Sequence, residues 1–193
     1  EDVDRNMYDF RNEEKDAYRI RSGLTEDIVE KISEEKHDPE WMHDFRLNSL
    51  KVYNEMKVPD WGPSIEGLNM DNIATYVRAN TKMKGDWSEV PEEIKDTFEK
   101  LGIPQAERTS LAGVGAQYDS ELVYHNVRKE AAEQGVIYTD MESALTGEYA
   151  DMVKEHFMKL VTPHDHKFAA LHGAVWSGGS FVYVPKGVSV EIP

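Results

Sequence analysis

The chain has 193 residues, no cysteine and a formal net charge of −15, because 37 Asp and Glu outnumber 22 Lys and Arg. The lack of cysteine excludes disulfides, thiolate metal sites and a cysteine nucleophile within these residues. The acidic balance argues against a nucleic-acid-binding surface. No apolar run reaches the roughly 18 residues that a membrane span needs.

In the first half of the chain, the sequence predicts a polar tail at residues 1–24, followed by helices. Thr25 is a predicted N-cap for a helix that runs to about Lys36. Asp38 is predicted to cap a second helix, with Pro39 at its first helical position. Six residues of that second helix fall on one face about 120° wide and are expected to face the core: Trp41, Met42, Phe45, Val52, Tyr53 and Met56.

The sequence VPDWGP at residues 58–63 ends this helix, and residues 68–84 are ambiguous between helix and strand. The elements predicted after them alternate short helices with one strand. In chain order they are a helix from Val90–Pro91 to Leu101–Gly102, a helix from Pro104 to about Leu111, a flexible joint at Gly113 and Gly115, a helix from Asp119 or Ser120 to Gln134, a strand at Val136–Thr139, and helices at Met141–Leu145 and Glu148–Leu160.

The C-terminal stretch FAALHGAVWSGGSFVYVPKGVSVEIP begins as a short helix, passes a Gly-Gly breaker and becomes two alternating strands. The strands are joined at Pro185-Lys186-Gly187, and this arrangement indicates the first rung of a β-solenoid. Such a rung buries its apolar face only against further rungs. Because the chain opens with Glu1 and stops directly after this strand, we expect a fragment whose continuation is rich in β-structure.

Two groups of residues invite a chemical interpretation. His164 and His166 form the tightest histidine pair, which could bind a metal ion if His172 or Glu155 supplied a third ligand. An exposed polar loop is the favoured interpretation of this pair, because metal sites normally have three or four protein ligands. The histidines at 125 and 156 are expected to be satisfied side chains within helices. Trp176 is predicted to close the end of the solenoid.

Two glycine-containing stretches suggest phosphate binding without completing a motif. Residues 113–115 (GVG) lack the third glycine and the preceding strand of a dinucleotide fingerprint, so a hinge before a helix is predicted. Residues 177–180 (SGGS) lack the Lys-Ser/Thr of a P-loop and are predicted to be the kink that starts the first strand. The sequence therefore assigns no catalytic, cofactor-binding or metal-ligating residue.

Five segments in series resemble the SufB branch of the SufB/SufD family of iron–sulfur cluster assembly scaffolds. They are EWM with FRL one turn later (residues 40–47), VPEEIKDTFEKLGIPQA (90–106), LAGVGAQYDSELVYHN (111–126), GVIYT (135–139) and the C-terminal stretch from Phe168 to Pro193. The resemblance extends from about Arg19 to Pro193. The pair His164 and His166 departs from the family pattern, which has a Pro-rich acidic turn with Asn before the KFAA run.

The resemblance implies an α+β fold, in which a helix-rich N-terminal domain leads into the first strands of a right-handed parallel β-helix. The expected division is a tail at 1–24, a helical domain at 25–160, and a junction with the first rung at 161–193. It also implies a cytoplasmic, non-enzymatic scaffold that acts with a SufC-type ABC ATPase, a SufD-type paralogue and a cysteine desulfurase or other sulfur donor. The iron–sulfur cluster would be held by residues outside this chain, while the acidic helical surface is a hypothetical docking site for the sulfur donor.

Three alternatives stay open at this level. The SufD paralogue shares the fold, although the stretches at 113–126 and 173–188 follow the SufB pattern more closely. A free-standing helical adaptor predicts a stable, cooperative monomer. A small metal-binding module at His164 and His166 predicts melting that depends on metal and loses this dependence on His166→Ala.

Overall fold

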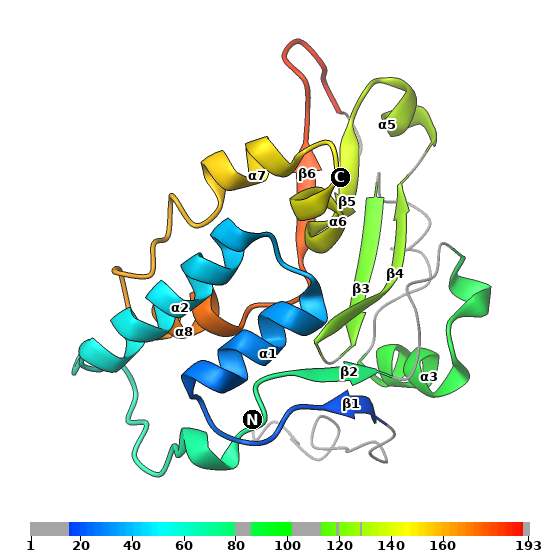
Figure 1. Ribbon diagram of the computed structural model, residues 1–193. Helices are drawn as coiled ribbons and strands as arrows, with labels where there is room; N and C mark the ends of the chain where they lie inside the picture. Colours follow the sequence, from blue (N-terminus) through cyan, green and yellow to red (C-terminus); the bar gives the residue numbers. More distant parts are fainter. Residues whose placement is uncertain (1–15, 80–85, 102–112, 119, 128, 191–193) are drawn as a thin grey trace. The chain divides into compact units, whose positions relative to one another are not determined.

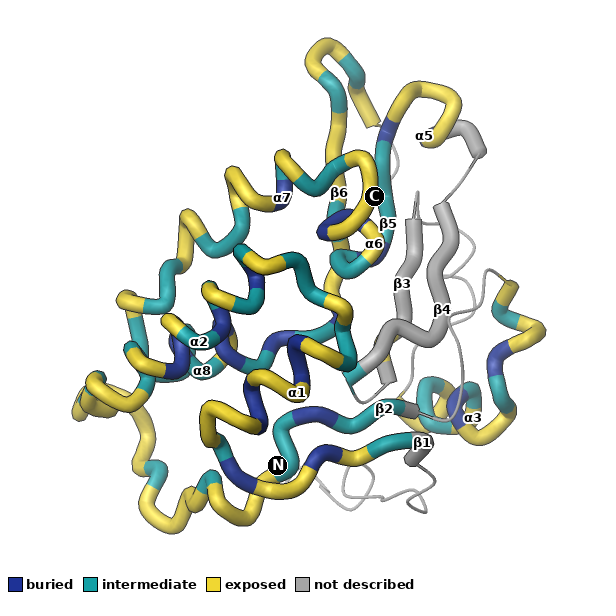
Figure 2. Tube along the Cα trace, in the orientation of Figure 1, coloured by how far each residue is buried: buried dark blue, intermediate teal, exposed yellow. Residues whose placement is uncertain are grey.

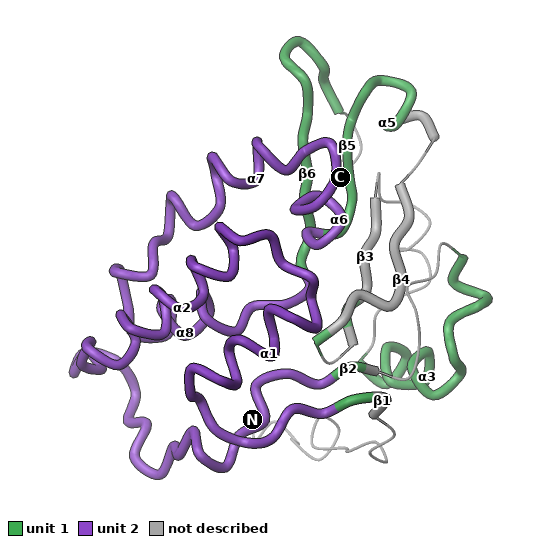
Figure 3. Tube along the Cα trace, viewed as in Figure 1, with its two compact units in different colours: residues 1–18, 78–140, 179–193 green, residues 19–77, 141–178 purple. Residues whose placement is uncertain are grey.

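The computed structural model describes residues 16–79, 86–101, 113–118, 120–127 and 129–190. The chain divides into two compact units, each built from separate stretches of sequence (Figure 3). Unit 1 contains Glu1–Tyr18, Arg78–Asp140 and Gly179–Pro193, and unit 2 contains Arg19–Val77 and Met141–Gly178. Among the residues described, no helix combines the length and apolarity needed to cross a membrane.

Unit 2 is helical. Its elements are α1 (Glu26–Lys36), α2 (Glu40–Glu55), the 3₁₀ helix η2 (Met70–Asn72), α6 (Met141–Thr146), α7 (Ala150–His156) and α8 (Lys167–Val175). Helices α2 and α8, which are far apart in sequence, lie side by side (Figure 1). Helices α1, α2 and α6 end at Lys36, Glu55 and Thr146. The ends predicted at Lys36, before residue 58 and at Leu145 are therefore confirmed to within a few residues.

The two predicted N-caps of unit 2 had different outcomes. Thr25 is the N-cap residue of α1, as predicted, although its hydroxyl donates to the Asp27 carboxylate instead of accepting from a backbone N–H. The prediction for α2 was wrong by one residue, since Pro39 is the N-cap residue and the helix begins at Glu40. The Asp38 carboxylate does not cap α2 because it accepts a hydrogen bond from Arg46.

The core of unit 2 forms where α1, α2 and α8 meet. Val29, Leu50 and Ala174 pack together, and Leu24, Leu47, Tyr53 and Val175 surround them. A Cβ atom on Gly173 would lie 2.6 Å from the Ser49 hydroxyl oxygen and 3.0 Å from the Ser49 Cβ. Glycine at this position therefore lets α8 approach α2 more closely than any other residue would.

The helix predicted from Glu148 to Leu160 is shorter in the structure. Helix α7 ends at His156, and the Phe157 N–H closes it by donating to the Val153 carbonyl. Met158 then adopts a φ of 46°, in the left-handed region that ends a right-handed helix. The prediction failed because the apolar pattern continues to Leu160, whereas the helical conformation of the backbone ends at His156.

Unit 1 contains two antiparallel strand pairs and short helices. Its elements are η3 (Trp87–Glu89), α3 (Glu92–Lys100), β3 (Gly113–Tyr118), β4 (Glu121–Val127), α5 (Lys129–Glu133), β5 (Ile137–Asp140) and β6 (Ser180–Tyr183). Strand β3 pairs with β4, and β5 pairs with β6 with Ile137 opposite Tyr183. Two further strands, β1 (Asp16–Arg19) and β2 (Val77–Ala79), form a third two-stranded sheet.

The structure overturns the predicted joint and helix between Gly113 and Gln134. Strands β3 and β4 pair as a hairpin, in which Gly115 lies opposite His125 and the register shifts between Ala116 and Gln117. His125 therefore lies on a strand, and among the described residues of this stretch the helix is confined to Lys129–Glu133. The stretch ELVYHNV is rich in β-branched and aromatic residues, which outweighs the capping signal of Asp119 and Ser120.

Other sequence predictions for unit 1 were accurate. The helix predicted after Pro91 is α3, and Pro91 is its N-cap residue. Gly135 ends α5 with a φ of 82°, and the predicted strand follows it as β5. The predicted helix from Pro104 to Leu111 lies outside the described residues, as do residues 1–15 of the tail predicted at 1–24. The described part of that tail is ordered, since Asp16–Arg19 form strand β1 and Ile20 is buried.

The C-terminal stretch follows its prediction up to the turn. Helix α8 is followed by Gly178 and Gly179, both with positive φ, and then by β6. The Val188 N–H donates to the Pro185 carbonyl and closes the predicted turn. Residues 188–190 are not a strand, so the second predicted strand is absent over the part of it that the structure describes.

Candidate functional site

A buried ion pair lies at the centre of unit 2. The Arg46 Nε atom donates to the Asp38 Oδ2 atom over 2.6 Å, and the two side chains are 0% and 1% exposed. Arg46 projects from the middle of α2, and Asp38 lies in the turn between α1 and α2. A fully buried charge is stable only when it is paired and hydrogen-bonded, so the partners of Arg46 decide its role.

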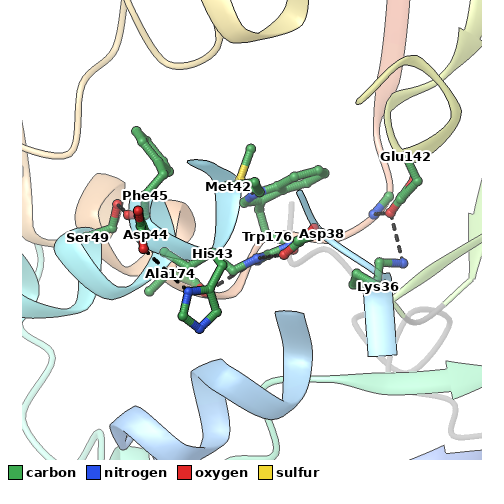
Figure 4. A network of polar contacts seen from close by, with 12 residues as sticks. Lys36, Asp38, Met42, His43, Asp44, Phe45, Ser49, Glu142, Ala174 and Trp176 are labelled. Atoms are coloured by element: carbon green, nitrogen blue, oxygen red, sulfur yellow. Dashed lines mark hydrogen bonds and ion pairs between the residues drawn. The ribbon is translucent and has the colours of Figure 1, made fainter. Parts of the chain in front are cut away.

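The other partners of Arg46 lie at the end of α8. Its Nη1 atom donates to the carbonyl oxygens of Trp176, over 2.8 Å, and Ala174, over 3.3 Å. The guanidinium carbon lies 4.8 Å from the centre of the Trp176 ring, within the range of a cation–π interaction. These two carbonyls belong to the last turn of α8, where acceptors have no partner within the helix, so Arg46 acts as a side-chain cap (Figure 4).

A second ion pair, between Lys36 and Glu142, holds the chain at Gly178, two residues after Trp176. The Lys36 Nζ atom lies 2.9 Å from the Glu142 Oε1 atom, and the Lys36 side chain is 4% exposed. The same carboxylate oxygen accepts a hydrogen bond of 2.7 Å from the Gly178 N–H. Lys36 ends α1 and Glu142 lies in α6, so this contact ties two helices to the segment that leaves α8 (Figure 4).

We call residues 174–178 the exit segment, because the chain passes through them from α8 toward β6. Arg46 holds the carbonyls of Ala174 and Trp176, and Glu142 holds the N–H of Gly178. Together with Asp38 and Lys36, these side chains form the exit clamp. The clamp fixes the path of the chain where it leaves the helical unit.

Trp176 packs inside unit 2, where its indole Nε1 atom donates to the Met42 sulfur over 3.3 Å. Its ring centre lies 5.0 Å from that of Phe157, which also contacts Phe45 and Trp41 edge-on. The sequence predicted that Trp176 closes the end of a solenoid. The structure shows it as the aromatic anchor of the exit segment, and its role at the end of a solenoid stays a prediction.

Of the two histidines paired in the sequence analysis, His166 serves the start of α8, whereas the backbone N–H of His164 donates to the Thr162 hydroxyl. His166 is the N-cap residue, and its Nδ1 atom accepts a hydrogen bond of 3.0 Å from the Phe168 N–H. The Asp165 carboxylate accepts from both the N–H and the hydroxyl of Thr162, and these bonds lower the pKa of Asp165. Within the described part of the chain, no three His, Asp or Glu side chains are arranged to hold a metal ion.

The glycine-rich stretches do not form phosphate sites. The Gly178 N–H is occupied by the Glu142 carboxylate, so residues 177–180 form the predicted kink. Gly113 and Gly115 lie on a strand, whereas the fingerprint requires a strand followed by a helix. Neither stretch presents the backbone arrangement that cradles a phosphate.

The sequence analysis missed the three residues that matter most here: Lys36, Arg46 and Glu142. Arg46 lies between Met42 and Ser49 on the buried face of α2, in the middle of an apolar pattern. A charged residue at such a position requires a buried partner, and this requirement was the available signal. The clamp is an arrangement for positioning the chain, since the hydrogen bonds and ion pairs that it makes join the protein's own side chains and backbone.

Comparison with known proteins gives a consistent family assignment. The model of the SufBD protein N-terminal region matches residues 26–193. The chain is 50% identical over 192 residues to the iron–sulfur cluster assembly protein SufB of Bacillus subtilis (strain 168), covering 100% of this chain and 41% of that protein. It is 52% identical over 192 residues to an iron–sulfur cluster assembly SufBD family protein of Staphylococcus haemolyticus (strain JCSC1435), with the same coverage.

A related SufBD family protein of Staphylococcus aureus (strain USA300) is 50% identical over the same length. The chain thus spans about 41% of the length of the curated relatives that it matches. The family model covers the exit clamp and all of α1 through β6. The chain therefore belongs to the SufBD family, of which it contains the N-terminal region.

Proposed function

We propose that the chain is the N-terminal part of a SufB-type scaffold, on which iron–sulfur clusters are assembled and from which they are transferred. The supporting observation is the 50% identity to a protein named SufB across the whole of this chain. That name favours the SufB type over the SufD paralogue. The contribution of these residues is structural: the helical unit positions the exit segment, through which the chain enters the next part of the protein.

The chemistry of the scaffold is assigned to residues outside this chain. Thiolates are the usual ligands of iron–sulfur clusters, and the chain contains no cysteine. The scaffold itself is not an enzyme in this proposal, and it acts with a SufC-type ABC ATPase, a SufD-type paralogue and a cysteine desulfurase or other sulfur donor. A cytoplasmic location belongs to the same proposal, because cluster chemistry on cysteine requires reduced thiols.

The fold of the missing part is also proposed. Strand β6 leads into a right-handed parallel β-helix, whose next rung covers the apolar side chains that follow α8. Val182 is 61% exposed, and Val184 and Val190 are also exposed. A strand whose apolar side chains are exposed to solvent leaves them poorly covered, which supports a β-rich continuation.

The function is tested with the full-length protein, purified without oxygen together with the ATPase and the paralogue. We expect incubation with ferrous iron, cysteine, the desulfurase and a reductant such as dithiothreitol, which supplies the two electrons that convert persulfide sulfur to sulfide, to load iron and acid-labile sulfide onto the complex. A loaded complex should then convert an apo-ferredoxin to its holo form. A complex that accumulates no sulfide, or that accumulates it without passing it on, would contradict the proposal.

The proposed fold has a separate test. Hydrogen exchange of the β6 amides is measured in the 193-residue chain and in the full-length protein. We expect the amides that do not donate to β5 to exchange more slowly in the full-length protein, because the next rung pairs with them. Equal rates in the two proteins would argue against a rung paired with β6, whatever the outcome of the cluster assay.

A further inference from the structure

The connection between α7 and α8 exposes two large apolar side chains in succession. Leu160 is 98% exposed and Val161 is 61% exposed. Figure 2 shows this connection as mostly exposed or intermediate along its length. Single exposed apolar residues are ordinary, but neighbouring ones beside a hollow are typical of an interaction site.

The connection is held in shape by its own hydrogen bonds. Thr162, directly after Val161, donates from its N–H and its hydroxyl to the Asp165 carboxylate over 2.5 and 2.7 Å. The Asp165 N–H donates back to the Thr162 carbonyl over 3.1 Å. Leu160 and Val161 are therefore presented by a closed turn, and less conformational freedom is lost when a partner binds them.

A pocket of about 420 Å³ opens beside these residues, within unit 2. Its apolar lining includes Met158, Leu160 and Val161, and its polar lining consists of His156, Lys159 and His172. No carboxylate is among the described residues that line it. The volume is within the range of pockets that take a small molecule or a few side chains.

The stretch of sequence that lines this pocket has a small excess of positive charge, in contrast to the chain as a whole. The chain as a whole carries −15, yet residues 154–172 contain three lysines, four of the seven histidines and only two acids, Glu155 and Asp165. The Asp165 carboxylate is engaged by Thr162. Partial burial and the nearby Arg46 charge lower the pKa of His172, so Lys159 rather than His172 supplies positive charge to the pocket at neutral pH.

We propose that this pocket, together with Leu160 and Val161, docks an acidic amphipathic segment of another protein. An apolar side chain of the segment fills the pocket, and a neighbouring carboxylate pairs with Lys159. The combination of an apolar hollow and a local positive charge selects such a segment. An anionic membrane fits less well, because its extended negative surface faces much of a chain that carries −15, whereas a short segment meets only the charge close to the pocket. This inference does not depend on cluster assembly.

The probe is a library of random dodecamers displayed on phage, selected on the full-length protein. Each round is counter-selected on full-length protein carrying Leu160→Ser and Val161→Ser, two changes at exposed positions that leave the core intact. We expect the enriched peptides to combine Asp or Glu with large apolar residues. No enrichment over the double variant, or enrichment of basic peptides, would overturn the proposal.

The selected peptides are then labelled, and their affinity for the full-length protein is measured by fluorescence anisotropy. Lys159→Glu should weaken binding at least about tenfold. The matched controls are Lys154→Glu, an exposed lysine that does not line the pocket, and Leu68→Ser, an exposed leucine elsewhere in unit 2. Equal losses in the controls would overturn the assignment to this pocket.

Two further measurements examine the competing occupants. Sedimentation equilibrium of the full-length protein and of the Leu160→Ser/Val161→Ser variant reports self-association. Flotation with vesicles of phosphatidylcholine and phosphatidylglycerol reports membrane binding. A dimer or a vesicle-bound form that the double variant abolishes would replace the proposed partner with a second copy or a lipid surface.

Discussion

Arg46 and Trp176 meet through both the side chain and the backbone of the tryptophan. The guanidinium carbon lies 4.8 Å from the ring centre, and Nη1 donates over 2.8 Å to the Trp176 carbonyl. The two residues are 130 positions apart in sequence. A residue of α2 thus fixes the point at which the chain leaves the helical unit, which is the contact that the proposed role of the unit requires.

Removing the Arg46 charge should destabilise unit 2 strongly. Arg46→Met leaves the Asp38 carboxylate buried without its partner, and breaking a buried pair in this way costs about 3–5 kcal/mol. The free energy of unfolding is measured by urea titration, followed by Trp fluorescence. Arg21→Gln is the control, because the Arg21–Asp27 pair is 57% and 50% exposed and should contribute little to stability.

A double variant separates the contribution of the Asp38–Arg46 ion pair to stability from that of the other Arg46 contacts. Replacing Asp38 with Leu as well as Arg46 with Met removes both charges, and much of the lost stability should return. The pair is imperfect, since Asp38 Oδ1 and Arg46 Nη2 are buried and have no hydrogen-bond partner among the described residues. If Arg46→Met costs no more than Arg21→Gln, the pair does not support the fold.

Gly173→Ala should push α2 and α8 apart. The added methyl group would lie 2.6 Å from the Ser49 oxygen and 3.3 Å from the Phe45 Cε1 atom, a collision that overpacks the interface by about 1–3 kcal/mol. Gly62→Ala is the matched control, because a Cβ there has no neighbour within 4 Å. The measurement is the free energy of unfolding of each variant.

The Gly173 variant can be rescued if the collision is with Ser49. Ser49→Gly removes both the Oγ and the Cβ atoms that the new methyl group meets. The double variant should therefore be more stable than the sum of the two single changes predicts. Strict additivity would show that the loss comes from the backbone of α8 and not from contact with α2.

The sequence predicted most helix positions because their ends carry strong local signals. Thr25, Pro91 and Gly135 act within a few residues of themselves, and each marks the end of an element in the structure. The apolar face of α2 was located only approximately, because Arg46 and Ser49 are more deeply buried than Trp41 or Val52. Their burial depends on α8, which local periodicity does not contain.

The hairpin at 113–127 was missed for a related reason. A cap signal at Asp119 and Ser120 competes there with β-propensity, and pairing between β3 and β4 decides the outcome. The exit clamp was not predictable in detail, since it joins residues as distant as Lys36 and Glu142. Only the presence of a charged residue in an apolar stripe indicated that a clamp of some kind was needed.

The Glu142 contact predicts a local effect at Gly178. Glu142→Ala removes the acceptor of the Gly178 N–H and the partner of Lys36, so exchange of the Gly178 amide should accelerate at least about tenfold. Glu142→Gln keeps an oxygen acceptor and should give a smaller change. Exchange in the middle of α1 should stay nearly constant in both variants. An unchanged Gly178 rate would mean that the contact does not protect the exit segment.

The pKa of His172 predicts how the stability of unit 2 depends on pH. Burial and the positive charge of Arg46 lower this pKa below its ordinary value of 6.5. Between the two values the unfolded chain binds more protons than the folded chain, so stability falls as the pH drops from about 7 through the folded pKa. The destabilisation is complete below the folded pKa and absent well above 6.5.

His172→Gln isolates this contribution from those of the carboxylates. The pKa values of Asp27 and Asp165 are also lowered, so their hydrogen bonds too are lost in acid, and the wild-type profile sums all of these effects. The difference between wild type and variant should favour the variant progressively as the pH falls below about 6.5. Urea titrations at pH 7.5, 6.5 and 5.5 measure it, and a difference that is constant across this range would contradict a lowered pKa for His172. In an Arg46→Met background, the stability difference caused by His172→Gln should depend less on pH. The reason is that Arg46→Met removes the positive charge that opposes protonation of His172.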